Sequence, residues 1–398
     1  MKLKSIRKLT FLILAGFFSL CLLTLLILFI VSGGFMKKTY LEPWDKKYAV
    51  QYQDPRISLA SVGLLAANNH NMQPWRIQLD KENPLVFFLY ADSSRVTKEV
   101  DPLYRQMMIT QGTFLEYVRL AGEELGWKTD IMLFPAGSYE EADILRSMDT
   151  KPVAKVTLSK VKPAANPLYD VIFMADTNRE AYQPKELTAP QITTLEALST
   201  KADLSIQLFT NREQLDTIGE YAKKSAVIEA GVPRVMEESN TIFRANEAAK
   251  NKYRYGFSVE GQGKTGFAKD LLQGLLTIFP SLNAGSSAAQ NFIQYTNTSV
   301  EHTPAYAMIL SKDNSRTSQV ESGMLYSRLV LAGHRQGLVM QPLSQVLEEY
   351  EEMQPLYKEF QGAYAPKNGT VQMLLRVGSP TKDAPLTMRR DVLELIQE

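Results

Sequence analysis

The chain has 398 residues, of which 45% are hydrophobic and 22% are charged, which suits one large or two ordinary globular domains. Lysine and arginine number 44 against 43 for aspartate and glutamate, so no positive field attracts nucleic acid and we expect no nucleic-acid partner. The single cysteine, Cys21, lies in an apolar N-terminal run. This excludes a disulfide framework and a cysteine metal site elsewhere in the chain.

No charged residue interrupts the run from Leu9 to Met36, which as a helix is long enough to cross a hydrocarbon layer of roughly 30 Å. We therefore expect residues 1–37 to form a membrane anchor. A cleaved signal peptide is the alternative, but its apolar region is shorter, about 7 to 15 residues, and ends at a small-residue cleavage motif that is not evident here. More basic residues precede the run than follow it, which predicts a single-pass cell-membrane protein with an inside N-terminus and an extracytoplasmic body. They are Lys2, Lys4, Arg7 and Lys8 before the run, and Lys37 and Lys38 after it.

Helical and strand-like patterns alternate irregularly after the anchor, which predicts an α+β fold. In the first part we expect helices over 57–67 and 103–125, and strands over 73–80, 84–92, 128–135 and 154–160. A stretch rich in Pro and Ala near residue 165 is typical of a linker. In the second part we expect helices over 187–200, 317–336 and in stretches that end near Leu276, with strands over 205–210, 305–312 and 370–378.

The two parts resemble one another when the sequence is shifted by 211 positions. The shift aligns Arg105 with Arg316, Gly112 with Gly323 and residues 120–122 with 331–333. Both segments also carry an apolar stripe at helical spacing and end at a glycine that leads into a strand. Two unrelated amphipathic helices are the alternative, but spacing as well as residue type agrees, which favours a duplicated unit.

The stretch NNHNMQPWRIQLD, residues 68–80, concentrates amide side chains and a histidine at the entrance to a strand. Asn68, Asn69, Asn71 and Gln73 each offer donors and acceptors, so one interpretation is a helix C-cap followed by a turn. The other interpretation is a polar ligand site that also includes His70. The residues alone leave both interpretations open.

The segment AANNHNMQPWRI, residues 66–77, resembles the flavin-binding motif of the nitroreductase superfamily, and its His-Asn form is similar to that of the Acg-like FMN-binding subfamily. Three further segments resemble family motifs in the same order. They are TNREAYQPKEL from Thr177, SGMLYSRLVLAGHRQGLVMQPLSQ from Ser322, and VQMLLRVGSPTKDAPLTMRRDVLELI from Val371. The chain departs from the family pattern at Asn68, where serine is usual, and at Glu180, where a second arginine is usual.

The resemblance implies a nitroreductase-like fold in which two fused, degenerate copies, residues 38–165 and 166–398, form an intrachain pseudo-dimer around one FMN. Residues near 231–290 have no counterpart at the 211 shift, and we expect them to form a lid over the flavin. Arginines are expected to bind the phosphate, amides and His70 the ribityl chain and pyrimidine, and the loop after Gly337 the flavin ring. The expected FMN contacts are Asn68, His70, Asn71, Gln73, Trp75, Asn178, Arg179, Pro342, Leu343, Ser344, Gln345, Arg389 and Arg390.

The implied activity is that of a membrane-anchored FMN oxidoreductase that reduces a small planar acceptor in a ping-pong cycle, with NAD(P)H or a quinol as electron donor. The cofactor carries the electrons, so no catalytic side chain and no metal are expected. A protein that sequesters flavin without turnover is the alternative, and a flavin-free interaction domain is a third. The P-loop-like stretch 258–266 lacks the first glycine and a preceding buried strand, which argues against nucleotide triphosphate binding.

Overall fold

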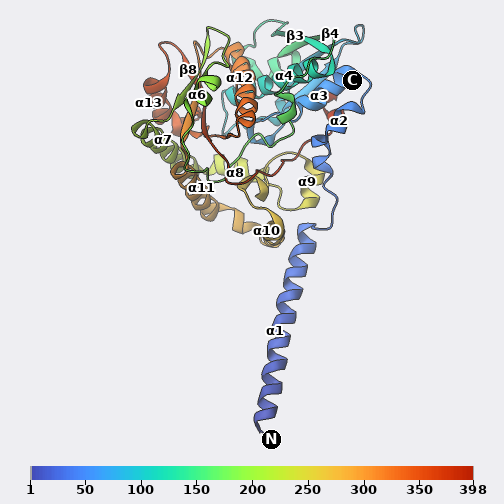
Figure 1. Ribbon diagram of the computed structural model, residues 1–398, viewed down its shortest axis with the longest axis vertical. Helices are drawn as coiled ribbons and strands as arrows, with labels where there is room; N and C mark the ends of the chain where they lie inside the picture. Colours follow the sequence, from blue (N-terminus) through green and yellow to red (C-terminus); the bar gives the residue numbers. More distant parts are fainter. Residues whose placement is uncertain (1, 398) are drawn as a thin grey trace.

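The computed structural model describes residues 2–397, with the side chains of residues 6–261 and 263–397. Met1 and Glu398, the outer limits of the predicted domains, and the side chains of Lys2 and Lys4 lie outside this description. Helix α1 (Lys2–Ser32) projects from the body as an isolated rod (Figure 1). Its stretch Ile6–Ser32 is long and apolar enough to cross a membrane, a property that N-terminal signal sequences share.

Two sheets form the body, and the predicted α+β class is confirmed. The first has strand order β3-β4-β2-β1-β9 and is antiparallel except for the parallel pair β1 and β9. The second, β5-β6-β8-β7, is antiparallel throughout. The strands are β1 (Trp75–Leu79), β2 (Val86–Ala91), β3 (Trp127–Leu133), β4 (Ala154–Lys160), β5 (Leu204–Phe209), β6 (Ala305–Ser311), β7 (Val339–Pro342), β8 (Thr370–Gly378) and β9 (Ile396–Gln397).

Helices α4 (Arg105–Leu125) and α12 (Arg316–Arg335) pack against each other between the two sheets (Figure 1). A Cβ atom on Gly112 would lie 1.8 Å from the Val320 carbonyl oxygen, and one on Gly323 would lie 1.9 Å from that of Ile109. Only glycine permits backbones to approach this closely. The two contacts are reciprocal, because the 211-residue shift relates Ile109 to Val320 as it relates the two glycines.

A helical region lies between the sheets and the end of α1, on the lower side of the body in Figure 1. It contains α7 (Arg212–Ala230), α8 (Pro233–Thr241), α9 (Glu247–Tyr253), α10 (Gly266–Ile278) and α11 (Gly285–Glu301). Sequence periodicity predicts helices as far as Leu276 but does not predict α11, whose residues are largely polar or small. The remaining helices are α2 (Lys46–Val50), α3 (Pro55–Gly63), α5 (Ile144–Thr150), α6 (Ala189–Glu196) and α13 (Gln354–Tyr364).

The C-terminal segment returns to the first half of the chain. The backbone N–H of Arg389 donates to the Tyr40 carbonyl at 2.9 Å, and the indole N–H of Trp44 donates to the Thr387 carbonyl at 2.8 Å. Strand β9 then pairs with β1 at the edge of the first sheet. Residues from both ends of the body therefore meet beside the 68–73 loop.

Candidate functional site

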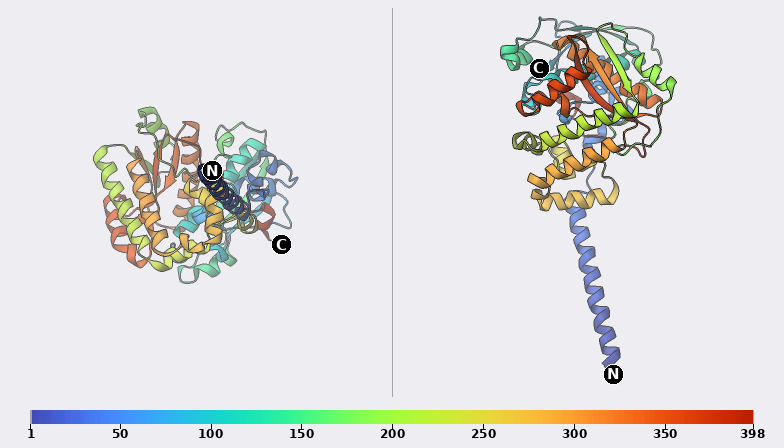
Figure 2. Two further views of the ribbon diagram at one scale, coloured as in Figure 1. Left: turned by 90° about the horizontal axis from the view of Figure 1, so that it is seen from below. Right: turned by 90° about the vertical axis from the view of Figure 1, so that its left-hand side faces the viewer.

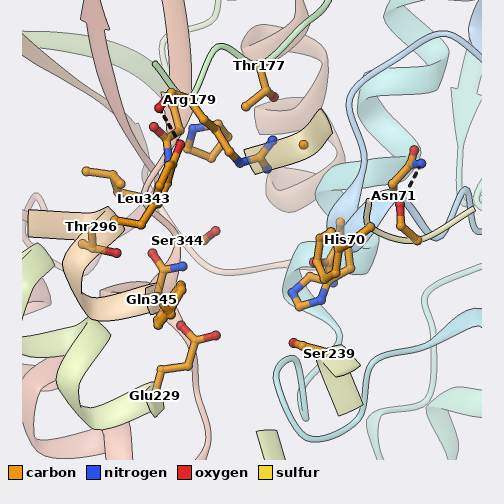
Figure 3. Close-up of a pocket in the computed structure, with 18 of the residues that line it drawn as sticks. His70, Asn71, Thr177, Arg179, Glu229, Ser239, Thr296, Leu343, Ser344 and Gln345 are labelled. Carbon is orange, nitrogen blue, oxygen red and sulfur yellow. Dashed lines mark hydrogen bonds between the residues drawn. The ribbon is translucent and has the colours of Figure 1, made fainter. Parts of the chain in front are cut away.

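A cavity of about 1040 Å³ lies at the junction of the two halves, and we call it the central cavity (Figure 3). Its volume is at the upper end of the roughly 300–1,000 Å³ typical of small-molecule sites, so it can hold a cofactor together with a second ligand. The first half supplies residues 67–71 and the start of α4. The second half supplies parts of α7, α8, α10 and α11, together with residues 176, 177, 179, 341–345, 347, 348 and 387–389.

The 68–73 loop is strained and is held by its own amide side chains. His70, Asn71 and Gln73 have φ near +50°, a left-handed conformation that costs of order 1–3 kcal/mol for a residue other than glycine. The Asn68 Oδ1 accepts the Gln73 N–H at 2.8 Å, and the Gln73 Nε2 donates to the Arg254 carbonyl at 2.8 Å. The Asn71 amide donates to two carbonyls, at 3.1 and 3.2 Å. These amide side chains form hydrogen bonds with other groups of the protein. For them, this favours the interpretation of the motif as a structural turn over that of a ligand site.

Four of the expected FMN contacts lie behind the cavity wall. Gln73 is fully buried and accepts the Arg390 N–H at 2.8 Å. The Arg390 guanidinium in turn donates to the Gln73 carbonyl at 3.2 Å. The Trp75 indole N–H donates to the Thr110 carbonyl at 3.1 Å, and the Asn178 amide donates to the Lys382 carbonyl at 2.9 Å. In this structure these four side chains support the walls of the central cavity.

Arg389 borders the central cavity, but protein groups already occupy most of its donors. Its guanidinium donates to the Asn71 Oδ1 at 3.0 Å and to the Leu65 carbonyl at 2.8 Å. Asp176 lies 3.6 Å away, too far for a strong pair. Burial lowers the pKa of Arg389, and the nearby Asp176 charge opposes that shift. Arg389 therefore joins the C-terminal segment to the 68–73 loop.

Arg179 and His70 face the central cavity from opposite halves (Figure 3). No carboxylate of the described residues lies within 4.0 Å of the Arg179 guanidinium, and the Arg179 backbone carbonyl accepts from the Tyr295 hydroxyl. The neighbouring Glu180 pairs with Lys382 at 3.0 Å, which offsets its charge. Desolvation, with a smaller contribution from the Arg179 charge, lowers the pKa of His70 to about 4, so its ring is neutral at pH 7.

The loop after β7 contributes Pro342, Leu343, Ser344 and Gln345 to the cavity wall. The Leu343 N–H donates to the Leu374 carbonyl at 2.8 Å and is not free for a ligand. Within the described part of the chain, the backbone N–H groups of Ser344 and Gln345 make no hydrogen bond. Two backbone donors are therefore open at this loop.

Sequence reasoning missed two buried carboxyl groups in the cavity wall, Glu229 and Glu348. Burial raises the pKa of both, and the charge of Glu229 raises that of Glu348 further. Figure 3 shows Glu229 beside Gln345, at the edge of the space that Arg179 and His70 face. Glu229 ends a surface helix and Glu348 belongs to an acidic run, so neither sequence context indicates burial.

Unsatisfied polar atoms are concentrated at the central cavity. Among the described residues, half of the sixteen buried side-chain polar atoms that lack a hydrogen-bond partner belong to residues in its wall. Buried polar groups are normally paired, so this concentration indicates a polar ligand. The atoms are His70 Nδ1, Arg105 Nε, Gln106 Nε2, Glu229 Oε2, Tyr326 Oη, Glu348 Oε2, Gln372 Oε1 and Arg389 Nε.

Comparison with known proteins gives similarities to nitroreductases, although no family model matches the chain. The putative NAD(P)H nitroreductase Rv3131 of Mycobacterium tuberculosis H37Rv is 21% identical over 351 residues, which cover 85% of this chain and 90% of that protein. A putative nitroreductase structure from Anabaena variabilis has a TM-score of 0.37 and 11% identity, covering 74% of this chain and 69% of its own.

The structure of the FMN-dependent nitroreductase NfnB from Mycobacterium smegmatis, in complex with NADPH, has a TM-score of 0.31 and 15% identity. The matched region covers 54% of this chain and 88% of the NfnB chain. The match to the mycobacterial protein Rv3131 extends over most of both chains.

Proposed function

We propose that this protein is a membrane-anchored FMN-dependent oxidoreductase of the nitroreductase type, close to the Acg-like subfamily. It reduces a small planar acceptor by a ping-pong cycle, with one FMN in the central cavity of each chain. The observation that carries this proposal is a cavity at the junction of the two halves where Arg179, His70 and two open backbone N–H groups converge.

The residues of the central cavity fit FMN. Arg179 is the guanidinium available for the phosphate, since a phosphate needs charge-assisted donors and Arg389 is committed to protein carbonyls. The neutral His70 ring can exchange a hydrogen bond with a hydroxyl or carbonyl of the cofactor, because its Nδ1 lacks a protein partner. The N–H groups of Ser344 and Gln345 can donate to the flavin ring. Bound FMN supplies two-electron transfer.

Glu229 and Glu348 can hold protons for the reaction. Reduction of an organic acceptor by two electrons consumes protons, and a carboxylic acid donates one only if it remains protonated near the working pH. Burial keeps both groups protonated above the range of an ordinary glutamate. Their position in the cavity wall therefore makes them proton donors for the acceptor, a role that flavin chemistry alone does not require.

The duplication and the membrane anchor complete the proposal. The reciprocal glycine contacts between α4 and α12 support a fused pseudo-dimer, because a two-fold interface makes each contact twice, once with the roles of the two copies exchanged. The composition and length of Ile6–Ser32 support an uncleaved single-pass anchor with the body outside the membrane. The relatives' names support a reduced nicotinamide as donor, and the external body supports a quinol.

The test is made on the full-length protein purified in detergent. We expect a flavin absorption spectrum, one FMN per chain, anaerobic bleaching by a donor and reoxidation by a nitroaromatic acceptor. A flavin that no donor or dithionite bleaches would instead support sequestration. A colourless protein that does not take up added FMN would contradict the proposal.

Replacement of Arg179 tests the phosphate contact directly. We expect Arg179→Gln to weaken FMN retention by at least about tenfold, because a charge-assisted hydrogen bond contributes roughly 1.5–3 kcal/mol. Arg335→Gln, which alters an exposed arginine at the end of α12, is the matched control and leaves retention unchanged. Equal FMN dissociation constants for the two variants, measured by fluorescence titration, would remove Arg179 from the site.

A further inference from the structure

Exposed apolar side chains are concentrated around α10 and the end of α1. Outside α1, the described residues include fourteen exposed large apolar side chains, and six of them lie in this one region. Phe279 is 53% exposed and Leu282 is 47% exposed, in the turn between α10 and α11. The others are Phe35, Met36, Phe267 and Ile278. A patch of this kind on a soluble surface marks a contact with a partner or a membrane.

The geometry of α1 places this patch at the surface of a bilayer. Residues 9–27 of α1 are uncharged and almost entirely free of the body, and as a helix they span roughly 29 Å, which matches a hydrocarbon layer of roughly 30 Å. From Leu28 onward α10 packs against one side of α1, while Ile30 on α1 stays exposed. A Cβ atom on Gly274 would lie 2.2 Å from the Leu28 carbonyl oxygen, and the Phe29 and Phe267 rings are 5.9 Å apart. Figure 2 shows α10 lying crosswise at the top of the α1 rod.

A buried charge network fixes α10 to the segment that follows the anchor. Glu247 of α9 accepts from Lys250 at 2.7 Å, from Lys269 of α10 at 2.9 Å and from the Tyr40 hydroxyl at 2.8 Å. Burial alone would raise the pKa of Glu247, but the two lysines hold it below its ordinary value, so the carboxylate stays charged. Ionic contacts of this kind restrict the body to one orientation above the bilayer.

The membrane-facing segment is also a wall of the central cavity. On the side nearest α1, the cavity is lined by Leu272 of α10, by Asn283 and Ala284 of the turn, and by several residues of α11. Phe279 and Leu282 lie in the same turn on the outside. One layer of helices, α10 and α11, therefore lies between the cavity and the end of α1, while the other walls include β7, β8, the 67–71 loop and parts of α4, α7 and α8.

From this arrangement we propose that the electron donor of the protein is a membrane-dissolved quinol, which enters the central cavity from the bilayer between α10 and α11. This inference rests on the proposed function, because it identifies the donor at that same site. Oxidation of a quinol to a quinone releases two electrons and two protons. Bound FMN would accept both electrons and one proton, the second proton would be released, and the small acceptor would later receive the two electrons. The exposed apolar side chains would hold the quinol's isoprenoid tail in the lipid beside α10 and α11.

The test uses the full-length protein in phosphatidylcholine vesicles. In one arm a long-tailed ubiquinol is dissolved in the bilayer, and in the other arm the tail-less ubiquinol is added to the surrounding solution. Anaerobic bleaching of the flavin is followed by stopped-flow absorbance. The double variant Phe279→Ser and Leu282→Ser should bleach at least about tenfold more slowly with the long-tailed quinol, since burial of one such side chain in an apolar phase is worth roughly 1.5–3 kcal/mol. Its bleaching by the tail-less quinol and its FMN content should not change.

Two controls separate a membrane effect from a general loss of apolar surface. Met132→Ser combined with Leu393→Ser changes side chains that are 60% and 53% exposed on the far side of the body, and should leave both rates unchanged. Phe279→Leu keeps an apolar side chain and should retain most of the long-tailed quinol rate.

Bleaching by the tail-less quinol but not by the long-tailed quinol would overturn the inference and leave the proposed function intact. Equal long-tailed quinol rates for the double variant and its control would do the same. Absence of bound FMN, or a flavin that neither quinol nor NAD(P)H bleaches, would overturn the proposed function itself.

Discussion

Polar side chains around the central cavity divide into those that bond to the protein and those that do not. Asn68, Asn71 and Gln73 belong to the first kind, because their amides hold a strained loop. Arg179 and His70 belong to the second kind, and they are the residues with free capacity for a ligand. The 68–73 loop therefore serves mainly to hold His70 in place, and its amide side chains contribute little to ligand binding.

Glu229 gives the sharpest prediction for a single residue. Burial raises the pKa of Glu229 in the folded protein. At a pH below the pKa of an ordinary glutamate, the carboxyl group is protonated in both the folded and the unfolded protein, so folding buries no charge. As pH rises, the unfolded chain loses this proton first and stability falls until the folded carboxyl ionises as well. We expect Glu229→Gln to be more stable than the wild type at about pH 9 and to differ little at about pH 4.

The measurement is the free energy of unfolding across that pH range in purified protein. Glu348 and Asp101 share the environment of Glu229, and Arg105 opposes them, so part of the pH dependence will remain in the variant. A stability difference between variant and wild type that does not grow with pH would show that Glu229 is ionised in the folded protein.

The crossing of α4 and α12 is the feature at the element scale that holds the two halves together. We expect Gly112→Ala to destabilise the protein by about 1–3 kcal/mol or more, because the added methyl would overlap the Val320 backbone. Gly362→Ala in α13 is the matched control, since nothing lies within 4 Å of its Cβ position. That control should stabilise by about 0.5–1 kcal/mol through helix propensity. Equal melting temperatures for the two variants would contradict the close packing.

Sequence patterns predicted the elements that have strong periodicity and missed those that depend on tertiary contacts. The strand expected over 370–378 is β8, and the helix expected over 103–125 corresponds to α4. Strand β9 has two residues and forms only because the C-terminus returns to β1, which no local pattern indicates. Helix α11 lacks a clear apolar stripe in sequence because it packs in a cavity wall of small and polar residues.

The candidate site was predictable to the level of segments but not of every side chain. The sequence indicated the 68–73 loop, Arg179 and the 342–345 loop, and all three border the central cavity. Spacing did not indicate that Gln73 and Arg390 bond to each other behind the wall. It also did not indicate Glu229 and Glu348, since burial of a carboxyl group depends on the surrounding fold.

At the scale of the whole molecule, the Glu247 network links the anchor to the body and sets their relative orientation. We expect Glu247→Ala to destabilise the protein by about 3–5 kcal/mol, because Lys250 and Lys269 would lose the fully buried carboxylate that they share and would keep only the less buried Glu260 and Asp270. Glu42→Ala, which removes an exposed pair with Lys37, is the control and should cost about 0–1 kcal/mol. Hydrogen exchange should show the loss in α9 and α10 first. Unchanged protection there would contradict a structural role for the network.

A crystal structure of the full-length protein soaked with FMN tests the central claim most directly. The account predicts one flavin per chain inside the central cavity, with its phosphate within hydrogen-bond distance of Arg179 and its ring against the 342–345 loop. Well-ordered protein with FMN bound outside this cavity, or with no flavin at a saturating concentration, would contradict it.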